Sequence, residues 1–330
     1  MHVTIDSLPG PESVPRIRTE RYVGDDNGVH LSDIETDHAE LVRRIYALLK
    51  DALSTLESGI NDTDPLWVSE RMKQARFLEK IQQFTRGLTT NGYDEKRRAT
   101  LRQVFHDLRG GALTVAYSRI QLAEMKGSEV EMSDVYGAFF AVRDHLKIMR
   151  NCVVDLDPKR RGRDLQRRTH SASLLREKWE NYADDHARVE YYSDFDGGLS
   201  SSCLEFSTVE RAMYNLVNNA LSHTADGRVR LFVTVLEPEE PENVKIATAN
   251  FISEAEQTEL ERSFGGDLGR LFEGGFSIGG SGVGLSVTAR MVSRAYGLES
   301  LRRAVEHGYV GATIRAGEFV AWMHWPVWQD

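Results

Sequence analysis

Apolar residues recur every three or four positions along the first half of the chain, and this spacing predicts α-helices. The first predicted helix begins near residue 32 and carries its apolar face on Leu41, Ile45, Leu49, Leu53, Leu56 and Ile60. Residues 61–65 end it, and a second helix is predicted from residue 66 to a turn at Asn91 and Gly92. Residues 1–30 hold three prolines and no sustained period, which predicts an irregular arm.

The next stretch predicts a helical hairpin. No proline lies between Leu66 and Asp157, so two long helices are expected over residues 94–126 and 129–157. Gly127 can end the first helix in a left-handed conformation. Ser128, with Glu131 three residues later, has the pattern of a capping box for the second.

The second helix of this hairpin carries a heptad seam of apolar residues. The seam runs through Met132, Val135, Phe139, Val142, Leu146, Met149, Val153 and Leu156. Because a lone pair of such helices buries too little apolar surface, we predict a four-helix bundle made by two chains, and hence a homodimer. The alternative is a monomeric bundle completed by the two N-terminal helices, which light scattering distinguishes.

The pattern changes after the hairpin. Six of the ten residues from 159 to 168 are basic, which predicts a linker. Beyond it, helices are predicted over residues 171–187, 208–224 (capped by Ser207 with Glu210) and 285–296. Strands are predicted over residues 188–195, near Leu204, and over residues 228–236 and 244–251. Residues 254–273 are predicted to form helical or irregular pieces, and two or three strands follow residue 296 and end at Trp325. This mixture predicts an α+β fold, in which a helical hairpin precedes an α/β sandwich.

The predicted organisation has five parts. They are an irregular arm (1–30), a helical region of unknown role (31–92), the hairpin (93–157), a basic linker (158–168) and the sandwich (169–330).

Composition narrows the class of protein. The chain has 330 residues and a net charge of -9, so neither nucleic acid nor an anionic membrane is predicted as a partner. No apolar run reaches the length of a membrane span and no signal-peptide pattern follows Met1, which predicts a soluble, cytoplasmic protein. The two cysteines lie far apart, so neither a disulfide nor a zinc site is expected.

One imidazole and one carboxylate stand side by side in the first hairpin helix. His106 lies about 100° round the helix from Phe105 of the apolar stripe, at the edge of the buried face. The carboxylate of Asp107 can fix one tautomer of the ring and take its proton while the other nitrogen attacks an electrophile. The pair Gly110 and Gly111 is expected to mark a bend or a close approach. Taken alone, this short motif is a weak signal and favours a solvated histidine beside a helical acid.

Two further motifs can carry chemistry. Asn215, Asn219 and His223 form a polar stripe at helical spacing, and amide oxygens are suitable ligands for Mg²⁺. Residues 279–285 are rich in glycine and precede a helix, an arrangement that lets backbone amides approach a phosphate. The spacing matches neither a P-loop nor a Rossmann fingerprint.

In this order the motifs resemble those of bacterial sensor histidine kinases, over roughly residues 94–325. His106-Asp107-Leu108-Arg109 resembles the H box, residues 215–224 the N box, 271–276 the F box, and 280–285 the G2 box of the GHKL ATPase domain. The resemblance implies a dimeric kinase that binds ATP and Mg²⁺, phosphorylates His106 and passes the phosphoryl group to a response-regulator receiver domain. It further implies that Asn219 holds Mg²⁺ with support from Asn215, and that Ser222, His223, Gly280, Gly282, Gly284 and Leu285 line the nucleotide site.

The sequence departs from the family pattern at several positions. Asn250 stands where the family has an adenine-binding Asp, the two glycines that follow in that motif are absent, and Phe251 is expected to crowd the base. Ser222 replaces a common Lys, and Gly110 replaces the residue that positions water for dephosphorylation. These departures keep a second hypothesis open, a histidine phosphotransferase or non-catalytic adaptor with a decayed nucleotide domain.

Overall fold

The computed structural model describes residues 8, 10–11, 28–180, 182–184, 186–235, 239, 241–276 and 282–328. The chain forms two compact units. The helical unit comprises Gly24–Gln166, and the sheet unit comprises Arg167–Asp330 together with Met1–Val23. The N-terminal arm therefore belongs with the second half of the chain, an association that the sequence pattern did not predict.

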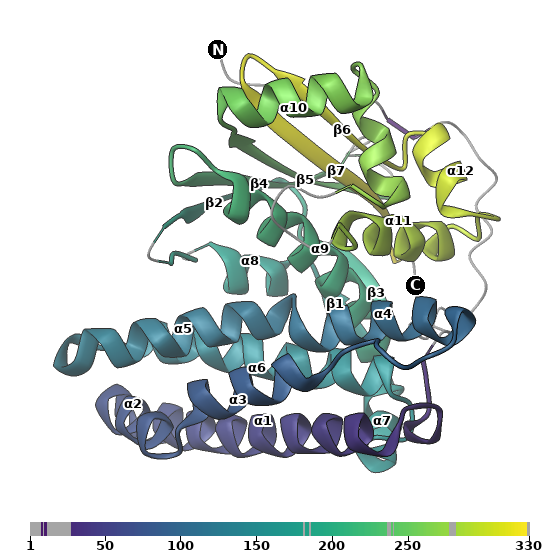
Figure 1. Ribbon diagram of the computed structural model, residues 1–330. Helices are drawn as coiled ribbons and strands as arrows, with labels where there is room; N and C mark the ends of the chain where they lie inside the picture. Colours follow the sequence, from purple (N-terminus) through teal and green to yellow (C-terminus); the bar gives the residue numbers. More distant parts are fainter. Residues whose placement is uncertain are drawn as a thin grey trace. The chain divides into compact units, whose positions relative to one another are not determined.

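The helical unit consists of seven α-helices in its described residues (Figure 1). They are α1 (Thr36–Asp62), α2 (Pro65–Gln74), α3 (Phe77–Gly87), α4 (Glu95–Arg109), α5 (Ala112–Lys126), α6 (Met132–Cys152) and α7 (Pro158–Asp164), with short 3-10 turns at Leu31–Asp33 and Gly127–Glu129. Helices α5 and α6 pack along each other as a hairpin. None of the helices in the described part of the chain is long and apolar enough to cross a membrane.

The heptad seam of α6 is buried within a single chain. Val142 and Met149 are fully buried, and α1 packs along α6 with Ile45 and Leu49 equally buried. The N-terminal helices therefore cover α6, as in the monomeric alternative, and the seam no longer argues for a second chain. The homodimer stays a prediction.

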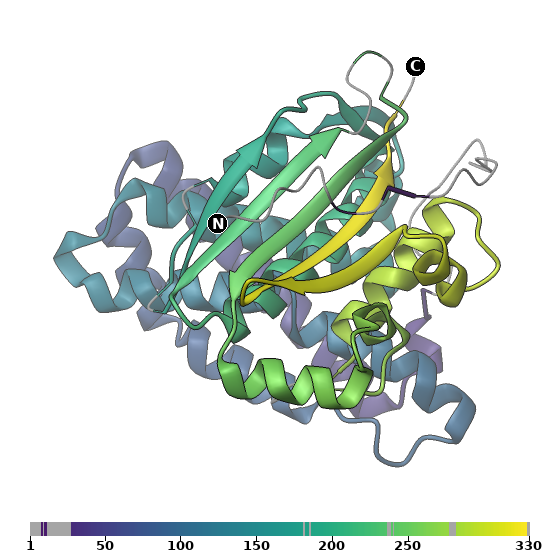
Figure 2. The ribbon, with the colours of Figure 1, turned by 90° about the horizontal axis from the view of Figure 1, so that it is seen from above.

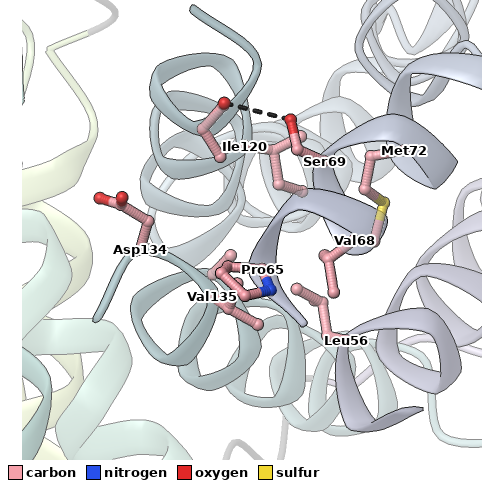
Figure 3. Close-up of a pocket in the computed structure, with 10 residues that line it drawn as sticks. Leu56, Pro65, Val68, Ser69, Met72, Ile120, Asp134 and Val135 are labelled. Carbon is pink, nitrogen blue, oxygen red and sulfur yellow. Dashed lines mark hydrogen bonds between the residues drawn. The ribbon is translucent and has the colours of Figure 1, made fainter. Parts of the chain in front are cut away.

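A small pocket marks where α1, α2, α5 and α6 meet (Figure 3). Its lining is mostly apolar and includes Leu56, Val68, Met72, Ile120 and Val135. Ser69 Oγ donates a hydrogen bond to the Ala123 carbonyl at 3.1 Å and joins α2 to α5. The free space is about that of one water molecule, so this is a gap in the core packing and not a ligand site.

The sheet unit contains two sheets and the remaining helices. Its elements are β1 (Arg167–Ser171), α8 (Ser173–Trp179), β2 (Arg188–Ser193), β3 (Gly198–Ser202), α9 (Cys203–His223), β4 (Arg228–Val235), β5 (Asn243–Phe251), α10 (Glu254–Phe264), the 3-10 helix η4 (Leu268–Glu273), α11 (Gly284–Ala295), α12 (Leu301–Glu306), β6 (Val310–Arg315) and β7 (Glu318–Pro326). The main sheet has the order β2-β4-β5-β7-β6, parallel only between β2 and β4, and β1 pairs with β3 separately. Helices α9 and α11 lie on one face of the main sheet (Figures 1 and 2). The predicted α+β class, with a hairpin followed by a sandwich, is confirmed.

Several local predictions were wrong for identifiable reasons. Helix α9 begins at Cys203 because Ser202, and not Ser207, accepts the cap hydrogen bond from the Glu205 amide. The capping box of α6 is formed by Glu131 with Asp134, while Ser128 lies in a 3-10 turn.

Two other errors concern whole segments. The stretch 158–168, predicted as a linker, begins with α7, because Asp157 caps a helix with proline in its first turn. The helix predicted from residue 66 is interrupted at Arg76, which has a left-handed φ of 52°.

Candidate functional site

His106 lies in the last turn of α4, beside the carboxylate of Asp107. Its Nδ1 is 3.2 Å from Asp107 Oδ1, and the two side chains are 17% and 1% exposed. Phe105 anchors this turn, because its fully buried ring makes edge contacts with the rings of His38 and Tyr93. The imidazole is therefore held on a rigid helix turn and keeps part of its ring exposed.

The helix breaks immediately after this turn. Gly110 is extended, and Gly111 has φ 56° and ψ -125°, a combination that only glycine adopts readily. The expected bend is thus a full break, and α5 starts afresh at Ala112. Because the Gly110 amide donates to the His106 carbonyl at 2.8 Å, His106 belongs to the C-terminal end of a helix.

Arg109 of the same motif has a structural role. Its Nη1 donates to the Leu88 carbonyl at 3.0 Å and its Nε donates to the Phe105 carbonyl at 3.1 Å. The bond to Leu88, the C-cap of α3, joins the end of α4 to the end of α3, while the bond to Phe105 lies within α4. Burial lowers the pKa of the Arg109 guanidinium.

Sequence reasoning missed a second histidine in this region. His145 of α6 is fully buried, and it lies beside the backbone of Leu108 and within the field of Asp107. Burial lowers its pKa to about 4, against the smaller opposing effects of the Leu108 backbone and the Asp107 charge. Neither ring nitrogen makes a well-formed hydrogen bond. The ring is thus neutral at pH 7, and no motif marked it.

Helix α9 presents the predicted polar stripe in the sheet unit. Asn215 is 7% exposed and its Nδ2 has no hydrogen-bond partner in the described structure. A Cβ placed on Gly284 would be 3.8 Å from the Asn215 side chain, so the structure brings Asn215 of α9 and Gly284 of α11 together. Asn219 is half-buried one turn further on, and Ser222 is exposed.

His223 ends the stripe and pairs with α10. Its Nδ1 is 2.8 Å from Glu256 Oε1. Although burial alone would raise the pKa of Glu256, hydrogen bonds from His223 and Ser253 lower it. His223 is therefore held in place by a carboxylate that the sequence did not identify.

Asn250 lies on β5, the strand against which α9 packs. It is 2% exposed, and its Oδ1 has no hydrogen-bond partner in the described structure, while its Nδ2 donates to the Phe251 carbonyl at 3.4 Å. Successive side chains of a strand point to opposite faces. Phe251 accordingly faces away from Asn250 and is 39% exposed; the expectation that it crowds the base stays a prediction.

The glycine-rich motif leads into α11. Residues 277–281, including the predicted Gly280, lie outside the described residues. Gly282 has a φ of 65°, and Val283, the N-cap of α11, provides no side-chain acceptor for the first amides. Leu285 is half-buried in the first turn. An uncapped helix N-terminus that follows glycines favours an anion.

Other candidate sites are limited. In the part of the chain that the structure describes, no group of His, Cys, Asp and Glu side chains could hold a metal ion. Cys152 and Cys203 form no disulfide in the described structure.

Comparison with known proteins gives a likeness of fold. No family model matches the chain, and no curated protein matches it. Solved structures that resemble it include the catalytic domain of histidine kinase ThkA, which is 17% identical over 42% of this chain and 78% of that chain, with a TM-score of 0.29. Full-length ShkA in complex with AMPPNP is 13% identical over 78% of this chain and 46% of that chain, with a TM-score of 0.33. The histidine kinase AdeS of Acinetobacter baumannii is 12% identical over 68% of this chain and 98% of that chain, with a TM-score of 0.28.

These solved structures are all histidine kinases. At such identities and scores, function has to be argued from the residues of the site.

Proposed function

We propose that this chain is an ATP-dependent protein-histidine kinase of a two-component pathway. His106 would take the γ-phosphoryl group of ATP and pass it to an aspartate of a response-regulator receiver domain. The observation that carries this proposal is the pair of buried amides, Asn215 and Asn250, whose Nδ2 and Oδ1 have no partner in the described structure. A buried polar atom without a protein partner is open to a ligand, and these two amides lie on α9 and β5, which pack against each other.

The residues of the sheet unit fit a nucleotide with Mg²⁺. Asn250 Oδ1 is an acceptor suited to the amine of adenine. The uncapped N-terminus of α11 suits the phosphates, and Asn219 offers an amide oxygen to Mg²⁺, which would neutralise phosphate charge. Gly282 and Gly284 keep the backbone accessible at this end of α11.

The helical unit supplies the nucleophile. With its proton on Nδ1, shared with Asp107 Oδ1 at 3.2 Å, the His106 ring has a lone pair on Nε2. Attack by Nε2 forms the N–P bond as the bond from phosphorus to the bridging oxygen breaks, and the Nδ1 proton can pass to Asp107. A carboxylate that is 1% exposed is well placed to stabilise the imidazolium character that develops.

Radiolabelling tests this proposal. The full chain, incubated with γ-labelled ATP and Mg²⁺, is expected to acquire an acid-labile, alkali-stable label that His106→Ala abolishes. His30→Ala, at a histidine that is 60% exposed in the same unit, is the matched control and should keep the label. Absence of label in the wild-type chain would contradict kinase activity of the isolated protein.

A second candidate is a histidine phosphotransferase or non-catalytic adaptor. The amide of Asn250 favours it, because the related kinases have a carboxylate at this position. Calorimetry with a non-hydrolysable ATP analogue distinguishes the two, since an adaptor shows no Mg²⁺-dependent heat.

A homodimer remains part of the kinase proposal. It now lacks the support of the α6 seam, and light scattering that gives the mass of one chain would remove it.

A further inference from the structure

One face of the main sheet is buried although none of the helices in the described part of the chain covers it. Helices α9 and α11 occupy the opposite face (Figure 1). On the outer face, Ala247 and Ala249 of β5 and Val320 and Trp322 of β7 are all at most 5% exposed, and Phe232 of β4 packs against them. A sandwich of two layers leaves its outer sheet face to solvent unless another segment covers it.

Leu8 of the N-terminal arm lies on this face. Leu8 is 4% exposed and belongs to the same apolar cluster as Ala247, Ala249, Val320 and Trp322. Lys245, the next outward-facing residue of β5, is 1% exposed and its Nζ donates to the Leu8 carbonyl at 3.2 Å. The face therefore holds both the side chain and the backbone of Leu8.

The contact continues past Leu8. Gly308 has a φ of 74°, and the Gly10 carbonyl oxygen lies only 3.0 Å from the position of a Cβ at Gly308. The Gly308 carbonyl accepts a hydrogen bond from Trp322 Nε1 at 3.3 Å. In Figure 2, which looks onto this face, the short purple stretch of the arm lies against the yellow part of the sheet. The arm thus runs from the centre of the sheet toward the turn before β6.

We propose that the outer face of the sheet is a binding site for an extended peptide with a leucine anchor, and that the chain's own N-terminal arm occupies it. The recognition elements are the apolar platform for the Leu8 side chain, the Lys245 ammonium for the carbonyl, and Gly308 for the close approach of Gly10. The partner class is an extended apolar peptide, here a segment of the same chain.

Docking of the arm sets how many chain connections join the helical unit to the sheet unit. Met1–Val23 and Arg167–Asp330 form one unit, and Gly24–Gln166 lies between them in sequence. With the arm docked, the helical unit is joined to the sheet unit at both of its ends. Release of the arm would leave a single connection, at residues 166–167. This proposal does not depend on kinase activity.

Exchange of the arm for a free peptide tests the site. In the full chain, Leu8→Asp puts a carboxylate on the apolar platform and should displace the arm. A fluorescent peptide of residues 2–16 should then bind this variant saturably. Binding to the wild-type chain should be at least roughly tenfold weaker, because a tethered arm competes at an effective concentration on the order of millimolar.

The controls separate this site from nonspecific binding. The same peptide carrying Leu8→Asp should bind the variant at least roughly tenfold more weakly, since a charge replaces the buried side chain. Lys245→Met, combined with Leu8→Asp in the chain, should also weaken binding of the wild-type peptide. Circular dichroism checks the fold, and Leu8→Ala serves as the acceptor chain if Leu8→Asp does not fold.

Two results would overturn the proposal. One is equal binding of the peptide to the wild-type chain and to the variant, which would place the peptide elsewhere. The other is no binding to a folded Leu8→Asp or Leu8→Ala chain, which would make the arm an inseparable part of the sheet unit.

Discussion

The residues of the proposed function form two groups, the histidine half in the helical unit (His106, Asp107 and Arg109) and the amide half in the sheet unit (Asn215 and Asn250), which differ in how completely their polar atoms are paired. His106 pairs with Asp107, and Arg109 donates to two carbonyl oxygens. In the described part of the sheet unit, by contrast, Asn215 Nδ2 and Asn250 Oδ1 have no partner. Each buried polar atom left unpaired costs about 1–3 kcal/mol. The side chains of the histidine half are thus held by protein contacts alone, whereas two buried atoms of the amide half have no protein contact in the described structure to hold them and are the atoms that the proposed nucleotide would pair.

The largest expected effect is on phosphorylation, where loss of the histidine should stop labelling without affecting nucleotide binding. His106→Gln should reduce labelling from ATP by at least roughly 100-fold, because the attacking nitrogen is gone, yet it should leave affinity for a non-hydrolysable ATP analogue unchanged. Asn215→Leu should abolish both labelling and binding. Labelling assays and calorimetry on the same preparations make the comparison, and loss of nucleotide binding in His106→Gln would show that the halves are not independent.

His145 is an exception to this comparison, because it is fully buried near Leu108 and Asp107 in the helical unit and neither of its ring nitrogens makes a well-formed hydrogen bond in the described structure. Its pKa of about 4 lies about 2.5 units below the ordinary value of 6.5. As the pH falls, the His145 ring is therefore protonated near pH 6.5 in the unfolded chain but only near pH 4 in the folded chain. Stability that depends on the neutral ring is fully present above pH 6.5 and is lost as the pH falls to 4, by on the order of 3 kcal/mol at about 1.4 kcal/mol per unit.

This effect of His145 is tested by comparing the loss of stability at acid pH in the wild-type chain and in two variants. Urea unfolding at pH 7 and pH 4.5 should show a smaller loss of stability in His145→Leu than in the wild-type chain. The exposed His30, changed to Leu, is the matched control and should behave as wild type. Parallel losses in all three proteins would show that burial of His145 does not affect the acid response.

The break after His106 is the next feature to test. Gly111→Ala should destabilise the helical unit by about 1–3 kcal/mol, because its φ of 56° and ψ of -125° strain any residue with a Cβ. Gly162→Ala, in α7 with no atom within 4 Å of the added Cβ, should stabilise by about 0.5–1 kcal/mol. Urea unfolding at pH 7 measures both, and equal effects would mean that position 111 tolerates a side chain.

The sequence predicted what depends on local pattern and missed what depends on distant contacts. Helix α6 and strands β4 and β5 follow from apolar periods, whereas the single helix predicted over residues 94–126 is divided at Gly110 and Gly111, where only a bend or a close approach was expected. The interruption at Arg76 has no glycine or proline to mark it. The docking of Leu8 on β5 joins residues 237 positions apart and leaves no periodic trace in a proline-rich arm.

The same division holds within the site. His106, Asp107 and the amide stripe were identified from residue types at helical spacing, and the resemblance to kinase boxes placed Asn215 and Gly284 in one site before the structure brought them together. His145 and Glu256 were missed because their importance comes from the elements that pack around them, which no spacing shows.

The smallest expected effect is the sharpest test of the amide half. Asn250→Asp places a carboxylate where Oδ1 has no partner in the described structure, and charge-assisted hydrogen bonds are stronger than neutral ones. Affinity for the ATP analogue should rise about tenfold, roughly 1.4 kcal/mol. Stability without nucleotide should fall, because a buried carboxylate lacks compensation.

Asn250→Leu, in which the new side chain is of similar size, should have the opposite effects: a gain in stability without nucleotide of about 1 kcal/mol, and loss of binding of the ATP analogue. Calorimetry and urea unfolding give the two readouts. If both variants weaken binding, the amide itself is the preferred partner, and the adenine-binding role proposed for position 250 would need a donor as well as an acceptor. If neither variant changes binding, the nucleotide does not contact this position, and the unpaired Oδ1 would reflect strain in β5 instead of a ligand site.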